Sequence, residues 1–295
     1  MNLAAPAETP RLPHQVAHCE ALVRAADKER YLAALFAPAA CRGALYALLA
    51  FNVEIARVRE VIREPLAGEI RLQWWSDAIA GNGAGDVQSN PVAGALLAAV
   101  AQHRLPRELL IGLIGAHRFD LYNEPMGTLA EFDEYGRATV TALTGLSAHI
   151  LGEGGAPGLG ELAFHAGLAH AIAGLLHAFP IHAARGQLYL PIEVLDRHGA
   201  RREDIAERRA TGELRAALGE MRVKARAHLA QAGRLADDMP AALLPALLPV
   251  ALARAVLDRM EGGDYDPFAP AEVPQWRKQW RLWRAARRPE RIFSA

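Results

Sequence analysis

The amino-acid sequence predicts an all-α protein. Of its 295 residues 52% are hydrophobic, and Ala and Leu dominate this set, whereas β-branched and aromatic residues are scarce. This composition favours helix over sheet. Apolar side chains recur at helical spacing along most of the chain, and Pro or Gly stands at most joints between the periodic stretches. No Ser/Gly/Pro linker separates halves of contrasting composition, so we expect one large helical domain without substantial sheet.

Five periodic stretches predict the helices of the first half, at about residues 15–36, 41–61, 63–80, 90–103 and 106–122. Pro38, Pro91 and Pro106 lie near their boundaries, where a missing N–H does least harm. The stretch from Gly43 to Val58 reads GALYALLAFNVEIARV and is apolar nearly all round. Such a helix is typical of the interior of a bundle.

Five more stretches predict the helices of the second half, at about residues 128–151, 158–184, 211–236, 240–262 and 273–287. A Gly-rich loop at 152–160 separates the first two, and Pro157, Pro191 and Pro240 lie near boundaries. The stretch 162–179 is rich in Ala, Leu and His and is apolar nearly all round. A bundle interior lined by such helices is where a long apolar ligand or cofactor would be held. A packed core without a cavity is the alternative that the pattern leaves open.

Charge and cysteine content exclude several classes of protein. Lys plus Arg number 33 and Asp plus Glu number 33, so no global field draws the chain to nucleic acid or to an acidic membrane. Cys19 and Cys41 offer neither a disulfide framework nor metal-ligand spacing. We find no apolar run of the roughly 18 to 20 residues that a membrane span needs. We therefore expect a cytoplasmic protein, either soluble or peripheral on the inner face of the membrane.

Several sequence blocks occur in the order found in squalene and phytoene synthases. The stretch CRGALYALLAFNVEIARVRE at 41–60 resembles their R-x-A-L-Y-A-F-C-R-x-x-D-D-x-x-D, and 111–143 resembles their segment ending in D-L-x-x-Y-C-x-x-V-A-G. YLPIEVLDRHG at 189–199 resembles G-R-x-Y-L-P-x-E, and YDPF at 265–268 matches too. The resemblance implies a terpenoid-synthase fold, like that of trans-isoprenyl diphosphate synthases, with a helical bundle around a central apolar cavity. Family members join two prenyl diphosphates head to head. We assign residues 1–270 to this domain and 271–295 to a separate C-terminal helix and tail.

The chemistry of this family depends on two acidic clusters. Ionising a prenyl diphosphate requires Mg²⁺ on the leaving oxygens, and carboxylates hold Mg²⁺. Aligned through the apolar half of the block at 41–60, the first cluster falls on Ala56 and Glu60, with Arg57 in place of an aspartate. Only Glu60 keeps a carboxylate, and the positive charges of Arg57 and Arg59 oppose metal binding.

The second acidic cluster is absent in the alignment, because its positions fall on Ala178 and His182. We therefore predict that metal-dependent ionisation is lost and that the protein has no metal or other cofactor, with Mg²⁺ required only if prenyl transfer survives. His170 and His177 are seven positions apart and share a helix face, but two histidines do not make a zinc site. We interpret His177 and His182 as pocket-lining residues, which would contact a ligand together with Arg57 and Arg59.

Other positions of the family pocket are retained. Arg42, Tyr46, Asp120 and Tyr135 stand where the resemblance places an arginine, an aromatic residue, the aspartate of the D-L motif and a pocket tyrosine. With Glu60 they are the family-equivalent pocket positions, although none is assigned a catalytic role. The alternative interpretation is a core tyrosine with a satisfied hydroxyl for Tyr135, and a structural ion pair for Asp120 and Arg42.

The C-terminal segment gives a separate signal. From Pro274 it reads PQWRKQWRLWRAARRPER, and Trp276, Trp280 and Trp283 share one helix face. Cations surround this face: Arg277, Lys278, Arg281, Arg284, Arg287 and Arg288. A basic amphipathic helix of this kind contacts an anionic membrane surface or a partner, or docks on the body of its own protein with the arginines solvated.

One subgroup of the superfamily is more similar still. The residues Phe51–Glu54, Leu72–Trp75, Phe119–Met126 and Gln275–Ala285 resemble motifs of the group that includes the mitochondrial assembly factor for respiratory complex I and its bacterial relatives. This resemblance implies a non-catalytic protein that binds an apolar lipid or isoprenoid or assists assembly of a membrane complex. Two alternatives remain: an active head-to-head prenyltransferase, and an enzyme that binds an anionic head group through Arg57 and Arg59 without metal.

Overall fold

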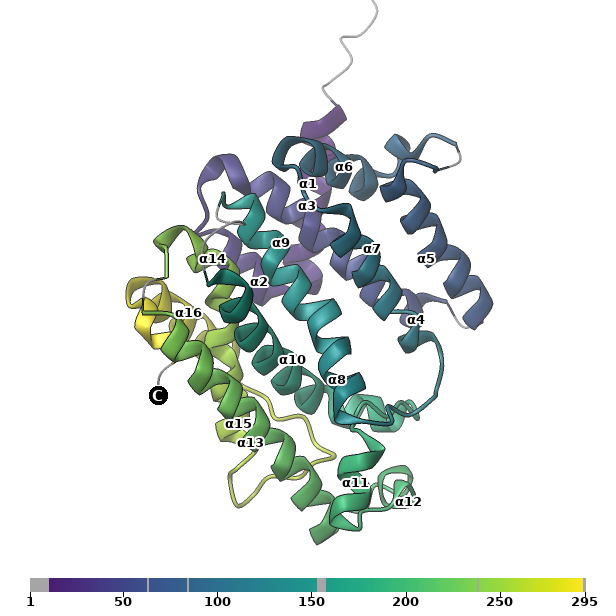
Figure 1. Cartoon of the computed structure of the whole chain (residues 1–295), viewed down its shortest axis with the longest axis vertical. Coiled ribbons are helices and arrows are strands. Elements are labelled where there is room, and N and C mark those ends of the chain that lie inside the picture. Colours follow the sequence, from purple (N-terminus) through teal and green to yellow (C-terminus); the bar gives the residue numbers. More distant parts are fainter. Residues whose placement is uncertain (1–10, 63, 84, 153–157, 238, 294–295) are drawn as a thin grey trace, which may run out of the picture.

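The structure is a computed structural model that describes residues 11–62, 64–83, 85–152, 158–237 and 239–293. These residues form helices and connecting turns with no strand, so the predicted all-α class is confirmed over the described part of the chain (Figure 1). The α-helices are α1 Arg11–Ala26, α2 Lys28–Ala34, α3 Ala39–Ala56, α4 Val58–Val61, α5 Pro65–Ala80, α6 Pro91–His103, α7 Arg107–Ala116, α8 Leu129–Gly136, α9 Ala142–Ile150, α10 Leu159–Ala184, α11 Ile192–His198, α12 Arg202–Ala206, α13 Gly212–Leu235, α14 Leu244–Leu247, α15 Ala253–Arg259 and α16 Gln275–Arg287.

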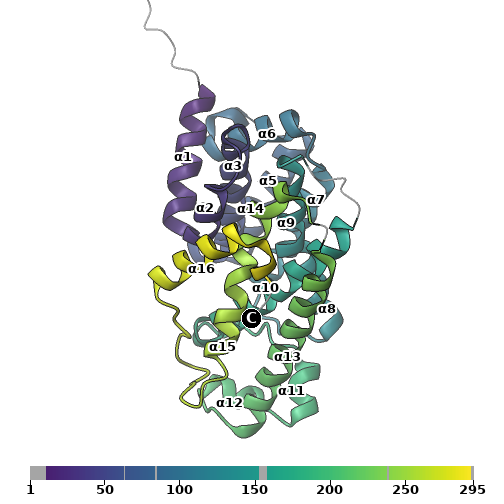
Figure 2. The same cartoon turned by 90° about the vertical axis from the view of Figure 1, so that its left-hand side faces the viewer.

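Two hydrophobic clusters form the core. In one, α3 packs against α1, α6 and α9, and in the other α10 packs along α13 and against α15. Figure 1 shows α1, α3 and α6 in the upper part of the molecule and α11, α12 and α13 in the lower part, with α9 and α10 between them. The end of the chain returns to its beginning, because α16 lies beside α2 in both views (Figure 2) and contacts it.

Some expected helices are divided. The stretch 15–36 breaks at Asp27, whose side chain accepts a hydrogen bond from the Arg30 N–H at 3.0 Å and so caps α2. The stretch 128–151 divides into α8, a π-helical turn at Arg137–Thr141, and α9. The short helices α11 and α12 were not predicted, and Pro157 and most of the loop at 152–160 lie outside the described residues.

The π turn meets α10 at a glycine. A Cβ atom added at Gly167 would lie 2.7 Å from the Thr141 Cα atom, closer than real Cβ contacts allow. Gly167 is fully enclosed in the core, with Leu168 and Ala166 beside it also buried. The absence of a side chain at this position is what lets α10 approach the π turn.

Three segments are long and apolar enough to cross a membrane: Ala39–Ala56, Leu159–Ala184 and Ala241–Arg259. The expectation that no stretch reaches this length is therefore wrong, because single polar residues interrupt these runs without lowering their mean hydropathy enough. Each segment is also part of the packed core, with 50%, 61% and 61% of its most apolar window buried inside the protein.

Candidate functional site

The positions aligned with the two acidic motifs lie where α3–α4 meet the end of α10, a region named the mouth after its counterpart in the family. Helix α3 ends at Ala56, and Arg57 leaves the helical conformation with φ −96° and ψ 4° before α4 begins at Val58. This change of direction places Glu60 toward Arg185, the residue directly after α10. The alignment therefore located the right region, although Arg185 had not been singled out.

Glu60 is held between two arginines. Arg185 Nη1 donates to Glu60 Oε1 at 3.0 Å, and Arg57 Nε donates to Glu60 Oε2 at 3.2 Å. Burial alone would raise the pKa of this carboxyl, but the hydrogen bonds from Arg185 and Arg57 lower it below its ordinary value. Both carboxylate oxygens are thus occupied, and the side chain that the alignment identified as the last acidic ligand is already neutralised.

Arg59 lies on the same side of the mouth. Its Nη2 donates to the Asn123 side-chain oxygen at 3.3 Å, and it is part of α4 with Glu60. Arg57 and Arg185 thus place two guanidinium groups directly on Glu60, and Arg59 lies on the same short helix. Positive charges this close oppose the binding of a metal ion by Glu60.

The second motif position supplies no acid. His182 lies on the last turn of α10, and its ring is 4.5 Å from that of Tyr189 between centroids. Burial lowers the pKa of His182 to about 4, so the ring is neutral near pH 7. His177 lies about one and a half turns earlier on α10. Burial, and then the charge of Lys278, lower its pKa. Its Nδ1 atom is buried and has no hydrogen-bond partner among the described residues.

Behind the mouth, Asp120 is the centre of a buried hydrogen-bond network. Tyr189 donates to Asp120 Oδ1 at 2.6 Å and Tyr135 donates to the same oxygen at 3.0 Å, while His117 Nδ1 lies 2.6 Å from Asp120 Oδ2. Gln187 Nε2 adds a bond to the Asp120 carbonyl at 3.4 Å. Burial and then the Asp120 charge raise the pKa of both tyrosines, which keeps them as donors. The network fixes two of the expected pocket residues as structural partners of each other.

Arg42 and Tyr46 do not join this region. Both lie in the first half of α3, at the end away from Glu60, and Arg42 Nε donates to the Ala37 carbonyl at 2.9 Å. Tyr46 is only 4% exposed and stacks on Tyr31 with ring centroids 5.8 Å apart. The resemblance places these residues at the pocket, but their contacts here are those of core residues.

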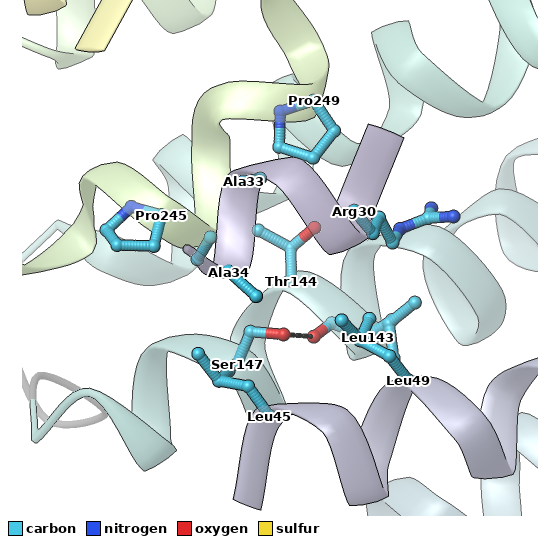
Figure 3. Close-up of a pocket in the computed structure, with 11 residues that line it drawn as sticks. Arg30, Ala33, Ala34, Leu45, Leu49, Leu143, Thr144, Ser147, Pro245 and Pro249 are labelled. Carbon is cyan, nitrogen blue, oxygen red and sulfur yellow. Dashed lines mark hydrogen bonds between the residues drawn. The ribbon is translucent and has the colours of Figure 1, made fainter. Parts of the chain in front are cut away.

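Two small pockets lie among the described helices inside the bundle. Figure 3 shows a pocket bordered by α2, α3, α9 and the segment around Pro245 and Pro249, and its volume is about 20 Å³. That is room for about one water molecule. Thr144 and Ser147 border it, and each hydroxyl donates back to the carbonyl four residues earlier, at 2.9 and 2.8 Å. A second inner pocket beside Phe132, His182 and Tyr189 also measures about 20 Å³.

A larger hollow lies on the other side of α8. It measures about 620 Å³ and runs between α7, the loop before α8, and the π turn. Its apolar lining includes Leu109, Phe119, Met126 and Tyr135, and Glu108, Glu124, Glu131 and Glu134 lie around it. Its volume falls within the range of pockets that hold small molecules. Sequence patterns did not predict this groove, because it forms between elements rather than within one.

The comparisons with known proteins agree with this architecture. The model of the family described as "Squalene/phytoene synthase" matches residues 23–284. The chain belongs to the squalene/phytoene synthase family. In the same family, squalene synthase HpnC from Alicyclobacillus acidocaldarius has a TM-score of 0.70 and 24% identity, covering 85% of this chain and 95% of that one. A dehydrosqualene synthase crystallised with a ligand has a TM-score of 0.78 and 19% identity, covering 92% and 95%. The predicted terpenoid-synthase fold is thereby confirmed.

A named relative outside the synthases is similar over almost the whole chain. It is the rat protein "NADH dehydrogenase (ubiquinone) complex I, assembly factor 6", which is 30% identical over 288 residues. The alignment covers 94% of this chain and 86% of the rat protein. The predicted membership of the family, and the similarity to its complex I assembly factors, are both confirmed.

No three His, Cys, Asp or Glu side chains come together in a metal-binding arrangement within the residues that the structure describes. The family's Mg²⁺ therefore has no fitting ligand set at the mouth: of the five aligned motif positions only Glu60 carries a carboxylate, and two arginines occupy it. No catalytic step through Mg²⁺ can be derived from these residues.

Proposed function

We propose that this protein is a non-catalytic member of the squalene/phytoene synthase family that acts as an assembly factor for a membrane-bound respiratory complex of the complex I type. The observation that carries the first part is the clamp of Arg57 and Arg185 on Glu60, at 3.2 and 3.0 Å. Replacing hard-cation ligands by guanidinium groups converts a Mg²⁺-diphosphate site into a closed ion-pair cluster.

The second part rests on similarity. The rat relative is named for the assembly of complex I, and the alignment with it leaves little of either chain unmatched. We place the protein in the cytoplasm, peripheral on the inner face of the membrane, where a partner complex would be reached. The expected contacts are a membrane surface or membrane complex through α16.

Catalysis is tested first. Purified protein is incubated with farnesyl or geranylgeranyl diphosphate and Mg²⁺, and diphosphate release and C30 or C40 hydrocarbon are followed beside an active synthase. We expect no turnover. Turnover that disappears in Glu60→Ala would overturn the proposal in favour of the alternative, an active head-to-head prenyltransferase.

The assembly role needs a separate test in the source cell. The gene is deleted, and the amount of assembled membrane NADH dehydrogenase is measured by native gel and by activity of the membranes. We expect a loss that is restored by the wild-type gene and also by the Glu60→Gln variant, since no catalytic carboxylate is required. A normal level of assembled complex in the deletion strain contradicts the assembly proposal and leaves the non-catalytic one standing.

We also propose an apolar lipid or isoprenoid as a ligand, and we place it in the groove between α7 and α8, which measures about 620 Å³, because the two inner pockets described above measure only about 20 Å³ each. Gly112 borders this groove, and a Cβ there would meet nothing within 4 Å. Gly112→Leu should therefore fill the groove and reduce co-purifying lipid. Gly160→Leu, an exposed helical glycine elsewhere with equal space, is the matched control. Equal lipid content in both variants would place the ligand elsewhere.

A further inference from the structure

The C-terminal helix α16 packs against the rest of the protein through a face that the sequence pattern did not single out. Leu282 and Ala285 are 1% and 2% exposed and pack into the core, and α16 contacts α2 and the segment Leu248–Leu252. Lys278 lies on this inner face as well, where its Nζ is 2.5 Å from Glu29 Oε1 of α2. The sequence analysis placed Lys278 among the cations around the tryptophan face. The ion pair of Lys278 with Glu29 instead helps to fix which side of α16 faces the protein.

This seating turns the tryptophans outward. Trp276, Trp280 and Trp283 are 64%, 52% and 38% exposed, although tryptophan is the largest side chain available for burial. Trp280 and Trp283 stack with ring centroids 4.9 Å apart. The helix therefore docks on the body of its own protein, which was one of the two options for this segment, but it does so through the smaller Leu282 and Ala285 rather than through the tryptophans.

Arginines surround the exposed rings. The guanidinium carbon of Arg287 lies 3.9 Å from the Trp283 ring centroid, and that of Arg277 lies 5.2 Å from Trp276. From residue 275 to residue 293 the sequence carries six arginines and one lysine against a single glutamate. The chain as a whole is neutral, with 33 residues of each sign, so this concentration of one sign is local.

The side chains enclose two hollows. One measures about 450 Å³, and its cationic lining comes from three elements: Arg254 of α15, Arg291 after α16, and Arg277, Arg281 and Arg284 of α16. The other measures about 320 Å³ and lies between Trp280, Trp283 and Arg284, Arg287 and Arg288. No acidic residue lines either hollow among the described side chains. Each hollow therefore combines guanidinium donors with indole faces.

We propose that this α16 surface, formed by Trp276, Trp280, Trp283 and the arginines around them, binds the surface of an anionic phospholipid bilayer. Guanidinium groups pair with headgroup phosphates, and indole rings enter the boundary between headgroups and acyl chains, where tryptophan is enriched in membrane proteins. A nucleic-acid duplex would pair with the arginines but would leave the three exposed rings without a partner, because its bases are already stacked, whereas a bilayer satisfies both groups. The inference rests on the proposed function, which leaves a membrane surface and a membrane complex open as the contact of α16, and it chooses the lipid surface; the turnover and gene-deletion tests can fail without affecting it.

The test uses the whole protein and sedimented vesicles. One set of vesicles is made of phosphatidylcholine alone. The other contains roughly 30% phosphatidylglycerol, which gives the vesicle surface a negative charge. We expect the protein to bind the anionic vesicles. Its affinity should fall roughly tenfold or more at high salt, and it should be weaker by a similar factor for vesicles of phosphatidylcholine alone. Lipids brominated near the headgroup should quench the exposed tryptophans, while buried Trp75 stays bright.

Two paired variants separate the contributions. Trp280→Ser with Trp283→Ser should abolish most of the quenching, and Arg281→Gln with Arg284→Gln should weaken binding roughly tenfold or more. The matched controls are Leu66→Ser with Ile70→Ser, exposed at 71% and 65% on α5, and Arg137→Gln with Arg197→Gln, which are paired elsewhere. Circular dichroism and urea midpoints verify that each variant is folded.

Two results would overturn the proposal. One is vesicle binding that is the same in the α16 variants as in the wild type. The other is tight binding to duplex DNA or heparin with no binding to anionic vesicles, which would make α16 a site for polyanions rather than for a bilayer.

Discussion

The carboxylate of Glu60 and the guanidinium of Arg185 are 125 positions apart in the sequence and meet at 3.0 Å across the mouth between α4 and α10. The pair joins the regions that align with the two acidic motifs. Its members are 39% and 48% exposed in their side chains, so solvent screens the attraction. We therefore expect the pair to oppose metal binding at Glu60 but to contribute little to the free energy of unfolding.

Glu60→Gln tests that distinction. Exposed ion pairs contribute about 0 to 1 kcal/mol, so the unfolding free energy in urea should fall by less than about 1 kcal/mol. Arg185→Gln should behave in the same way, and the double variant should show little coupling. A loss well above that range would mean that the clamp holds α4 onto α10.

Asp120→Asn should be far more damaging. The carboxylate accepts from Tyr135 and Tyr189 and lies beside His117, and the residue is 8% exposed. An amide nitrogen placed among donors leaves buried groups unpaired, for which we expect a loss of about 2 to 5 kcal/mol. Asp258→Asn, at an exposed ion pair with Arg226, is the control. Equal urea midpoints for the two variants would contradict the buried-network interpretation.

Two glycines of α10 should respond in opposite directions to the same substitution. Gly167→Ala drives a Cβ to 2.7 Å from the Thr141 backbone, and such overpacking should destabilise the protein by about 1 to 3 kcal/mol. Gly174→Ala meets nothing within 4 Å in the same helix and should stabilise it by about 0.5 to 1 kcal/mol. Thermal unfolding of both variants measures the difference, and a shared sign would contradict the close approach.

Stability should fall as the pH is lowered from about 6.5 to about 4. Burial, and then the charge of Arg30, lower the pKa of His170 to about 4, whereas an unfolded histidine takes up its proton near pH 6.5. The unfolded state therefore holds more protons in this window, and the native state loses stability as pH falls. Asp27 and Glu29 act in the opposite direction but do not cancel the effect.

The measurement is a urea titration at pH 7 and at pH 5. His170→Gln should reduce the drop in unfolding free energy between the two, by an amount on the order of 1 kcal/mol or more. His14→Gln, an exposed histidine of α1, is the control and should keep the wild-type drop. An unchanged drop in His170→Gln would mean that other groups set the acid sensitivity.

Much of the fold followed from local pattern. The predicted stretch 158–184 corresponds almost residue for residue to α10, Leu159–Ala184. Prolines lie at helix boundaries as expected: Pro91 begins α6, and Pro240 lies between α13 and α14. Helices such as α11 and α12 were missed because five to seven residues carry too little periodicity. The division of α3 from α4 at Arg57 also escaped prediction, because it is a backbone change within a continuous helical pattern.

The site was located by alignment rather than by chemistry. The motif positions led to Glu60 and His182, but the partner Arg185 emerges only when α4 and α10 are brought together. On α16 two faces compete, since Trp276, Trp280 and Trp283 alternate with Leu282 and Ala285 around one helix. Only the tertiary contact with α2 decides between them, because hydrophobicity alone favours burying the larger rings.

The ion pair between Lys278 and Glu29 joins residues 249 positions apart, and Ile292 and Phe293 are buried nearby in the same core. During synthesis, α2 leaves the ribosome long before its cover exists. Helix α2 must wait for nearly the entire chain before this contact can form, and until then the part of its surface that α16 covers stays exposed. A chain that stops before α16 would leave this part of α2 uncovered, so one of the last helices to be made completes the packing of one of the first.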